Sequence, residues 1–180
     1  MAERLRLLGC DVTGADQSDR GFEAQVPHVV IDLNMADFAS PLGKGKYDLV
    51  TSIEVIEHIE SPIGFLRNVH ALLSPQGVAV ITTPNVDSLP ARLKHLLSGK
   101  IRMMDEYGDP THITPIFIDL LKHRYLPATG LELRKHLLFP VNGFQQSRKI
   151  FSWPMRLAAS ILPGTCLLGD HHVLILGPSL

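Results

Sequence analysis

A strand-like segment that ends in a cluster of acidic residues and a histidine constrains this 180-residue chain most. Residues 47–52 (YDLVTS) have the apolar and β-branched content of a strand buried on both faces. Glu54, Glu57 and His58 follow at spacings of three and four, which on a helical turn would bring them to one face. Open α/β sheets place their chemistry at the carboxyl ends of parallel strands. The segment therefore predicts a site there, although an acidic, solvated helix start has the same pattern.

Strand-like and helix-like segments alternate along the rest of the chain. A serine at the N-cap and a proline at the first helical position, Ser61 and Pro62, mark the clearest helix start. The pattern predicts helices over residues 2–8, 62–73, 89–97, 115–126 and 150–162, and strands over residues 10–14, 28–31, 47–52, 77–83, 131–138 and 172–176. Such alternation indicates an α/β fold with a mostly parallel sheet, and the length fits a single domain over residues 1–180.

The composition of the chain indicates its cellular compartment and limits the classes of partner that it could bind. Two cysteines, Cys10 and Cys166, do not form a disulfide framework, which favours a cytoplasmic protein. The first residues lack a signal-peptide core, and no apolar run reaches membrane-spanning length. Residues 88–180 are basic but poor in aromatic side chains, so we expect no nucleic-acid partner. Residues 150–162 could contact a membrane surface, although a helix covering the sheet has the same pattern.

Two aspartates follow predicted strands. A carboxylate at a strand end can accept hydrogen bonds from both hydroxyls of a nucleotide ribose, and Asp16 is placed for that role. Asp32 could take a second contact, such as an adenine amino group. Aspartates also cap helices and form turns, so both readings stay open.

Four segments together resemble a known family. In order they are GCDVTGADQS, HVVIDLN, YDLVTSIEVIEHIESP and LLSPQGVAVITTPN. They are similar to class I S-adenosylmethionine-dependent methyltransferases, and most similar to the ubiquinone-biosynthesis O-methyltransferase group. The resemblance covers residues 2–85 and extends in outline through the later segment HITPIFIDLLKHRYLPATGLEL. It implies a Rossmann-like sheet whose last strand is antiparallel, with S-adenosylmethionine as the methyl donor.

The resemblance also implies positions for the methyl donor. Asp16 matches the acid that binds the ribose, and Asp32 and Leu33 match the pair that flanks the adenine. Ile53 matches the residue that lies along the cofactor just after the strand.

An ExxEH pattern implies a metal site. Glu54, Glu57 and His58 match residues that bind a divalent cation in ubiquinone O-methyltransferases and in small-RNA 2′-O-methyltransferases. The RNA enzymes add a later histidine, and His112 lies in a comparable place. Carboxylates with imidazole suit Mg²⁺, Mn²⁺ or a similar cation. Because related enzymes keep the string without demonstrated metal use, Glu57 and His58 are equally candidates for metal-free catalysis or for a structural role.

One departure from the family concerns its glycine-rich loop. In the family a strand and this loop precede the helix that begins here at Ala2, and the 180 residues contain no such loop. The GxG at residues 43–45 precedes a strand instead of linking a strand to a helix. The missing strand is the middle one of the family's sheet, so its two neighbours would each expose unpaired backbone groups. We therefore expect an N-terminally truncated domain, either a piece of a longer chain in which Met1 is internal or a natural partial domain that has lost cofactor binding.

Three functions follow from these observations. The leading one is methyl transfer from S-adenosylmethionine to an oxygen of a small-molecule acceptor. A non-catalytic methyltransferase-like domain is the second, because the glycine-rich loop is absent. A nicotinamide-dependent oxidoreductase is the third, since Asp16 would serve NAD equally well, but no tyrosine has a lysine four residues later and the acidic cluster has no role there. For the 180 residues alone, weak S-adenosylmethionine binding or none is expected.

Overall fold

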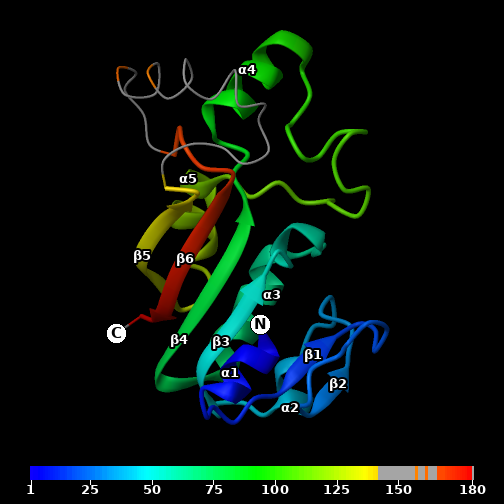
Figure 1. The fold of residues 1–180 in the computed structure, drawn as a ribbon. Helices are drawn as coiled ribbons and strands as arrows, with labels where there is room; N and C mark the ends of the chain where they lie inside the picture. The colour runs from blue at the N-terminus through cyan, green and yellow to red at the C-terminus, as the bar shows by residue number, and fades with distance from the viewer. Residues whose placement is uncertain (142–156, 158–160, 162–165, 180) are drawn as a thin grey trace.

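The α/β fold expected from the sequence is confirmed. A computed structural model describes residues 1–141, 157, 161 and 166–179 (Figure 1). The predicted helix over residues 150–162 lies almost entirely outside these residues. The described helical elements are α1 (Ala2–Leu7), α2 (Ala39–Leu42), the 3₁₀ turn η1 (Ile56–His58), α3 (Pro62–Leu72), α4 (Leu89–Ser98), α5 (Ile118–Leu120) and the π-helical turn η2 (Leu121–Tyr125). No described helix has the length and apolarity that crossing a membrane requires.

The larger sheet has four strands in the order β3-β4-β6-β5. Its strands are β3 (Tyr47–Ile53), β4 (Leu73–Pro84), β5 (Leu131–Phe139) and β6 (His171–Pro178). The β3–β4 pair is parallel, whereas β6 runs antiparallel to both β4 and β5. The antiparallel last strand expected from the family resemblance is therefore confirmed.

The two earlier strands form a separate sheet. β1 (Gly14–Asp16) pairs in parallel with β2 (His28–Val30), and neither joins the four-stranded sheet. We expected the segments at residues 10–14 and 28–31 to join those at residues 47–52 and 77–83 in one sheet, but the described residues place them in two sheets. The free edges of β1 and β3 face each other across a gap (Figure 1), where the family's middle strand was expected to lie.

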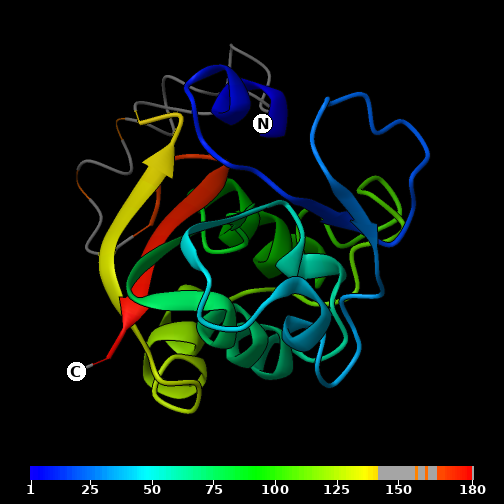
Figure 2. The same ribbon diagram turned by 90° about the horizontal axis from the view of Figure 1, so that it is seen from below.

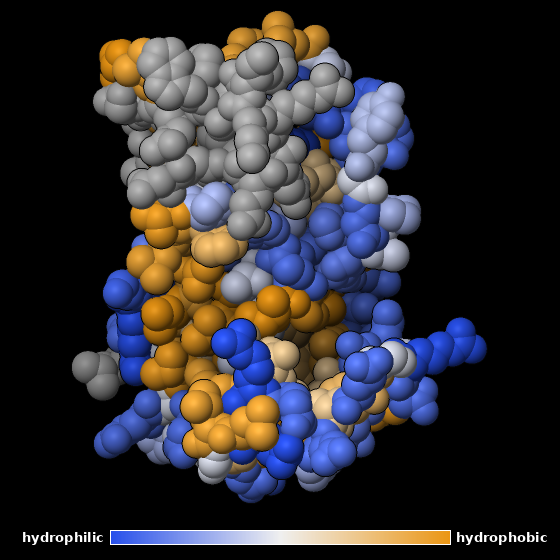
Figure 3. All heavy atoms as spheres, viewed as in Figure 1, coloured by the Kyte–Doolittle hydropathy of each residue, from blue (hydrophilic) through white to orange (hydrophobic). Residues whose placement is uncertain are grey.

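A hollow of about 520 Å³ occupies this gap. Residues 10–13 and Ala15 line one wall, residues 46–52 line the other, and apolar side chains of α3 form part of the floor. Figure 3 shows the surface hollowed between the sheet and the N-terminal segments. Ser52 is among the residues that line this hollow, and its buried hydroxyl has no hydrogen-bond partner. The two sheets are therefore joined through α3 and the core but not through a backbone ladder.

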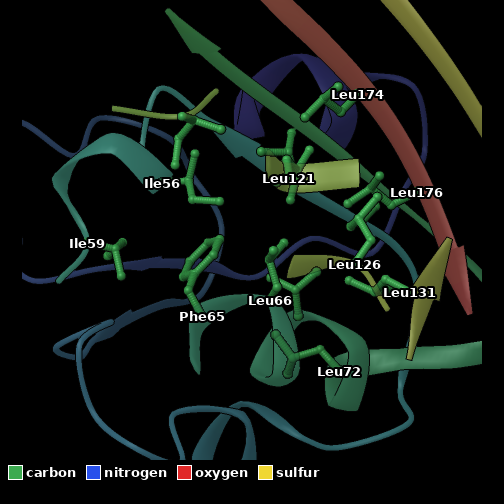
Figure 4. Close-up of a cluster of buried hydrophobic side chains, with 14 of the residues drawn as sticks. Ile56, Ile59, Phe65, Leu66, Leu72, Leu121, Leu126, Leu131, Leu174 and Leu176 are labelled. Atoms are coloured by element: carbon green, nitrogen blue, oxygen red, sulfur yellow. The ribbon is translucent and has the colours of Figure 1, made fainter. Parts of the chain in front are cut away.

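The core lies between the four-stranded sheet and α3, with α5 and η2 beside it (Figure 4). Figure 2 shows α1 across the molecule from α3 and α5. The side chain of Ser61 accepts a hydrogen bond from the Gly64 amide and Pro62 begins α3, which confirms the predicted helix start. The buried residues Phe65, Leu66 and Val69 of α3 then face the sheet.

The predicted helix over residues 115–126 is shorter than expected. Residues 113–117 are irregular, and α5 and the π turn begin only at Ile118. Just before the predicted helix, the backbone amides of Ile113 and Thr114 donate to the carbonyl oxygen of Glu57, at 3.0 and 2.9 Å. This tertiary contact attaches the segment that contains His112 to η1.

Candidate functional site

The chain turns sharply where β3 ends. Glu54, the first residue after β3, has a φ of 52°, an uncommon value for a residue with a side chain. Its amide donates to the hydroxyl of Thr82 at 3.1 Å, and that hydroxyl donates to a Glu54 carboxylate oxygen at 2.8 Å. The other carboxylate oxygen lies 3.0 Å from Nδ1 of His171 on β6. The hydrogen bond to Glu54 raises the pKa of His171. Burial alone would raise the pKa of Glu54, but the bonds from His171 and Thr82 bring it below its usual value.

Glu57 is a fully buried carboxyl group in η1. Its Oε2 atom accepts a hydrogen bond from the Thr83 hydroxyl at 3.1 Å, and its Oε1 atom has no hydrogen-bond partner. Burial, together with the neighbouring Glu54 carboxylate, raises the pKa of Glu57 to about 7. An unpartnered buried carboxylate oxygen costs about 1–3 kcal/mol or more unless a proton or a cation satisfies it.

Two histidines approach this carboxyl group with fixed tautomers. Nδ1 of His112 lies 2.9 Å from the carbonyl oxygen of Met103, and Nδ1 of His58 lies 3.1 Å from the carbonyl oxygen of Thr111. Because a carbonyl only accepts, Nδ1 of His112 must carry the proton and donate it. Nδ1 of His58 also lies 2.9 Å from the Thr111 hydroxyl, but that hydroxyl donates to Asp109, so this Nδ1 is a donor as well. In the neutral rings each Nε2 atom then keeps its lone pair, and Nε2 of His112 lies 4.0 Å from Oε1 of Glu57. A backbone carbonyl that holds the far nitrogen in this way is the usual support of a metal-bound imidazole.

Three of the four predicted metal ligands converge. Glu57, His58 and His112 each present a ligand atom, and these atoms lie within 4.8 Å of one another. The fourth, Glu54, is not part of this group and is bonded to His171 and Thr82 instead. The expectation that one helical turn brings Glu54, Glu57 and His58 to the same face is wrong. The turn η1 begins only at Ile56, and Glu54 belongs to the preceding, non-helical turn.

A polar hollow of about 470 Å³ adjoins the two histidine–carboxylate pairs. Glu54, His112 and His171 line it, as do Tyr107 and Gly108 from the segment after α4. Figure 1 shows this segment, drawn in light green, as a long excursion between α4 and α5. The hollow has room for a small molecule beside His112, the member of the Glu57–His58–His112 group that lines it.

The predicted cofactor residues lie around the other hollow, between β1 and β3. Leu33 lines it directly, and so do Ala15 and Ser52, the chain neighbours of Asp16 and Ile53. The carboxylates of Asp16 and Asp32 accept hydrogen bonds from the amides of Ser18 (3.3 Å) and Asn34 (2.9 Å). Both aspartates therefore form the turns considered from the sequence, and each keeps an exposed carboxylate for a ligand. Their role in cofactor binding stays a prediction.

Three features of the site were not predicted from the sequence. His171 on β6, 117 positions after Glu54, pairs with that carboxylate. Thr82 and Thr83 orient Glu54 and Glu57 from the end of β4. Gly108 gives its backbone close access to Met103, because a Cβ atom there would lie 2.4 Å from the Met103 carbonyl oxygen that holds His112. Thr82, Thr83 and Gly108 can be seen in the sequence, but nothing there indicates which residues they contact. Thr82, Thr83 and His171 reach Glu54 and Glu57 from strands that are distant in the sequence.

Comparisons with known proteins show the family to which the chain belongs. Residues 1–136 match the family model described as a methyltransferase domain. A ubiquinone biosynthesis O-methyltransferase of Roseobacter denitrificans is 34% identical over 91 residues, which are 47% of this chain and 37% of that protein. The aligned segment thus spans little more than a third of that relative's length.

Solved structures show the same fold. A SAM-dependent methyltransferase from Archaeoglobus fulgidus superposes with a TM-score of 0.60 at 17% identity, over 97% of this chain and 79% of that one. The Burkholderia thailandensis 1,6-didemethyltoxoflavin-N1-methyltransferase, solved with bound 1,6-didemethyltoxoflavin and S-adenosylhomocysteine, gives a TM-score of 0.59 at 13% identity, over 98% of this chain and 65% of that one. On the match over residues 1–136, the chain belongs to the methyltransferase domain family of S-adenosylmethionine-dependent enzymes.

Proposed function

We propose that this domain serves methyl transfer from S-adenosylmethionine to a hydroxyl oxygen of a small molecule, assisted by a divalent cation at Glu57, His58 and His112. The observation that carries the proposal is the convergence of these three side chains. Likeness to an O-methyltransferase favours oxygen as the accepting atom.

The donor set fits a hard or borderline cation. Oε1 of Glu57 is buried without a hydrogen-bond partner, and the Nε2 lone pairs of His58 and His112 are available because their Nδ1 atoms donate to carbonyl oxygens. One carboxylate and two imidazoles suit Mn²⁺ or Mg²⁺ when the remaining positions are taken by water or substrate oxygen. When bound, the cation would supply positive charge that lowers the pKa of an acceptor hydroxyl.

The protein's own residues position the reaction. Thr83 and the backbone of residues 113–114 hold Glu57 in place, and Met103 and Thr111 hold the two imidazole rings. The polar hollow lined by His112 and Tyr107 would hold the acceptor. Methyl transfer is an in-line displacement, so holding donor and acceptor in line is the main task of such a site. Asp16 and Asp32 would hold the nucleoside of the methyl donor, with Leu33 and Ile53 along its apolar parts.

His58 gives the site an alternative without a cation. Its Nε2 lone pair can accept the proton of the acceptor hydroxyl, since Nδ1 is already protonated and donates to Thr111. The cation and general-base roles use the same atom and therefore exclude each other.

A non-catalytic role is the second candidate, and the hollow between β1 and β3 favours it. There the described residues leave two strand edges unpaired beside the residues expected to bind the cofactor. In that case Asp16 and Asp32 would have no ligand to hold.

Methyl transfer to a panel of phenols and catechols, measured with labelled S-adenosylmethionine at millimolar concentration, tests the proposal. Activity should fall on chelation, return with Mg²⁺ or Mn²⁺, and lose this response in Glu57→Gln, because a carboxamide keeps the shape of the side chain but not its charge. If the chelator leaves activity intact while His58→Ala removes it, His58 is the general base and the cation role is refuted. If no acceptor is methylated at any donor concentration, the non-catalytic role stands.

A further inference from the structure

A second cluster of ligating side chains lies on β5 and β6. His136 comes from β5, His172 from β6, and Cys166 from the segment just before β6. Each offers a ligand atom, and the three atoms lie within 4.8 Å of one another. Nε2 of His136 and Nδ1 of His172 are 2.9 Å apart. The methyltransferase site described above uses none of these residues.

The cluster shares no residue with the group formed by Glu57, His58 and His112. His171 and His172 are neighbours on β6, and adjacent strand residues point to opposite faces. His171 points to Glu54 on one face, whereas His172 points to His136. His171 and Glu54 therefore lie on the face opposite the cluster. Glu57 is hydrogen-bonded to Thr83, which pairs with His172, so the two groups of potential ligands approach the same face through different residues.

Backbone contacts fix the position of Cys166. The amide nitrogen of the fully buried Asn85 side chain donates to the carbonyl oxygens of Cys166, Leu168 and Gly169, at 2.9, 3.0 and 3.1 Å. Cys166 is 6% exposed and has a φ of 66°, a value that few residues with a side chain adopt. Asn85 thus holds this segment against the end of β4, with the cysteine close to the two histidines.

The hydrogen bonding of His172 is incomplete. Its side chain is fully buried, Nδ1 faces His136, and Nε2 has no hydrogen-bond partner. Whichever nitrogen carries the proton, one buried polar atom is left over, which costs about 1–3 kcal/mol. Burial lowers the pKa of His172 to about 3 and also lowers that of His136. Both rings are therefore neutral at physiological pH and keep lone pairs.

We propose that His136, His172 and Cys166 form a binding site for a borderline-soft divalent cation of the zinc class. A thiolate with two imidazoles is a ligand set that zinc accepts, with a fourth position for water or another group. Two nitrogens bound to one tetrahedral ion at about 2.0–2.1 Å lie about 3.3 Å apart, so the observed pair needs to open by only a few tenths of an ångström. The ion would join β5, β6 and the segment held by Asn85, and would release the proton of the thiol on binding.

Cobalt(II) added to the full 180-residue chain tests the proposal, because a thiolate ligand gives cobalt a charge-transfer band in the near ultraviolet. We expect one equivalent of Co²⁺ to produce this band and Zn²⁺ to abolish it by displacement. Cys166→Ser should remove the band, whereas Cys10→Ser, which changes the exposed cysteine, should keep it. Glu57→Gln should also keep it, which separates this site from the proposed Mg²⁺ or Mn²⁺ centre.

Because a change at the fully buried His172 risks misfolding, His136→Gln provides the second variant. It should weaken Co²⁺ binding at least tenfold while leaving the circular dichroism spectrum unchanged, and His95→Gln, an exposed histidine on α4, should have no effect. Absence of the band in the wild-type chain, or its persistence in Cys166→Ser, would overturn the proposal and leave the two rings as a hydrogen-bonded pair.

Discussion

The two edges of β3 differ in their backbone pairing, because among the described residues only one of them is hydrogen-bonded to another strand. One edge pairs with β4 in six register positions, and at its end the chain turns into Glu54 and Glu57. The other edge faces a hollow of about 520 Å³, with β1 and β2 on the far side. The residues proposed to bind the cation and the acceptor therefore lie beside the paired edge of β3, which we call the finished side. The residues proposed to bind the cofactor lie around the hollow at the unpaired edge, which we call the open side.

The largest expected difference between the two edges is in stability. Ile81 on β4 is 1% exposed and packs in the core, whereas Leu49 on β3 is 43% exposed and lines the hollow. Ile81→Ala should lower the free energy of unfolding by about 2–5 kcal/mol. Leu49→Ala should cost less than about 1 kcal/mol, because it removes little buried contact. Urea unfolding of both variants measures the difference, and equal losses would show that the gap is closed in solution.

Much of the finished side could be predicted from the sequence. Ser61 and Pro62 mark the start of α3, and the apolar runs of β3 and β4 place Glu54 at a strand end, because local hydrogen bonding and periodicity determine these features. The partners of the site could not be predicted. His171 reaches Glu54 through the antiparallel pairing of β6 with β4, and His112 reaches Glu57 through amides of residues 113–114 that bond to its carbonyl oxygen. Such long-range pairings have no signature in local sequence.

The finished side should also show an unusual pH dependence. The pKa of Glu57 is raised from 4.5 to about 7 in the folded protein, so between these values the folded chain binds more protons than the unfolded chain. Stability without added metal should therefore fall as pH rises from about 4.5 to 7, by about 2–4 kcal/mol for this group. Unfolding in chelator at pH 5 and pH 8 measures the slope, and Glu57→Gln should remove this part of it. A slope unchanged by that substitution would contradict the raised pKa.

The open side should bind the methyl donor weakly. Asp16 and Asp32 keep exposed carboxylates for the nucleoside, but the described residues provide no glycine-rich loop for the methionine part. Calorimetry should therefore detect S-adenosylmethionine binding only far above micromolar concentrations. Asp16→Asn should weaken what remains by about tenfold, which corresponds to one charge-assisted hydrogen bond. Micromolar affinity would mean that another segment replaces the loop.

Mn²⁺ titration of the 180-residue chain, followed by electron paramagnetic resonance, tests most directly whether Glu57, His58 and His112 form a cation site. The wild-type chain should bind one Mn²⁺ at this centre, and Glu57→Gln should abolish that binding. Glu60→Gln is the matched control because Glu60 is exposed and lies three residues further on, so it should bind as the wild type does. Equal Mn²⁺ binding by the wild type and Glu57→Gln, or no binding by either, would contradict the proposed centre.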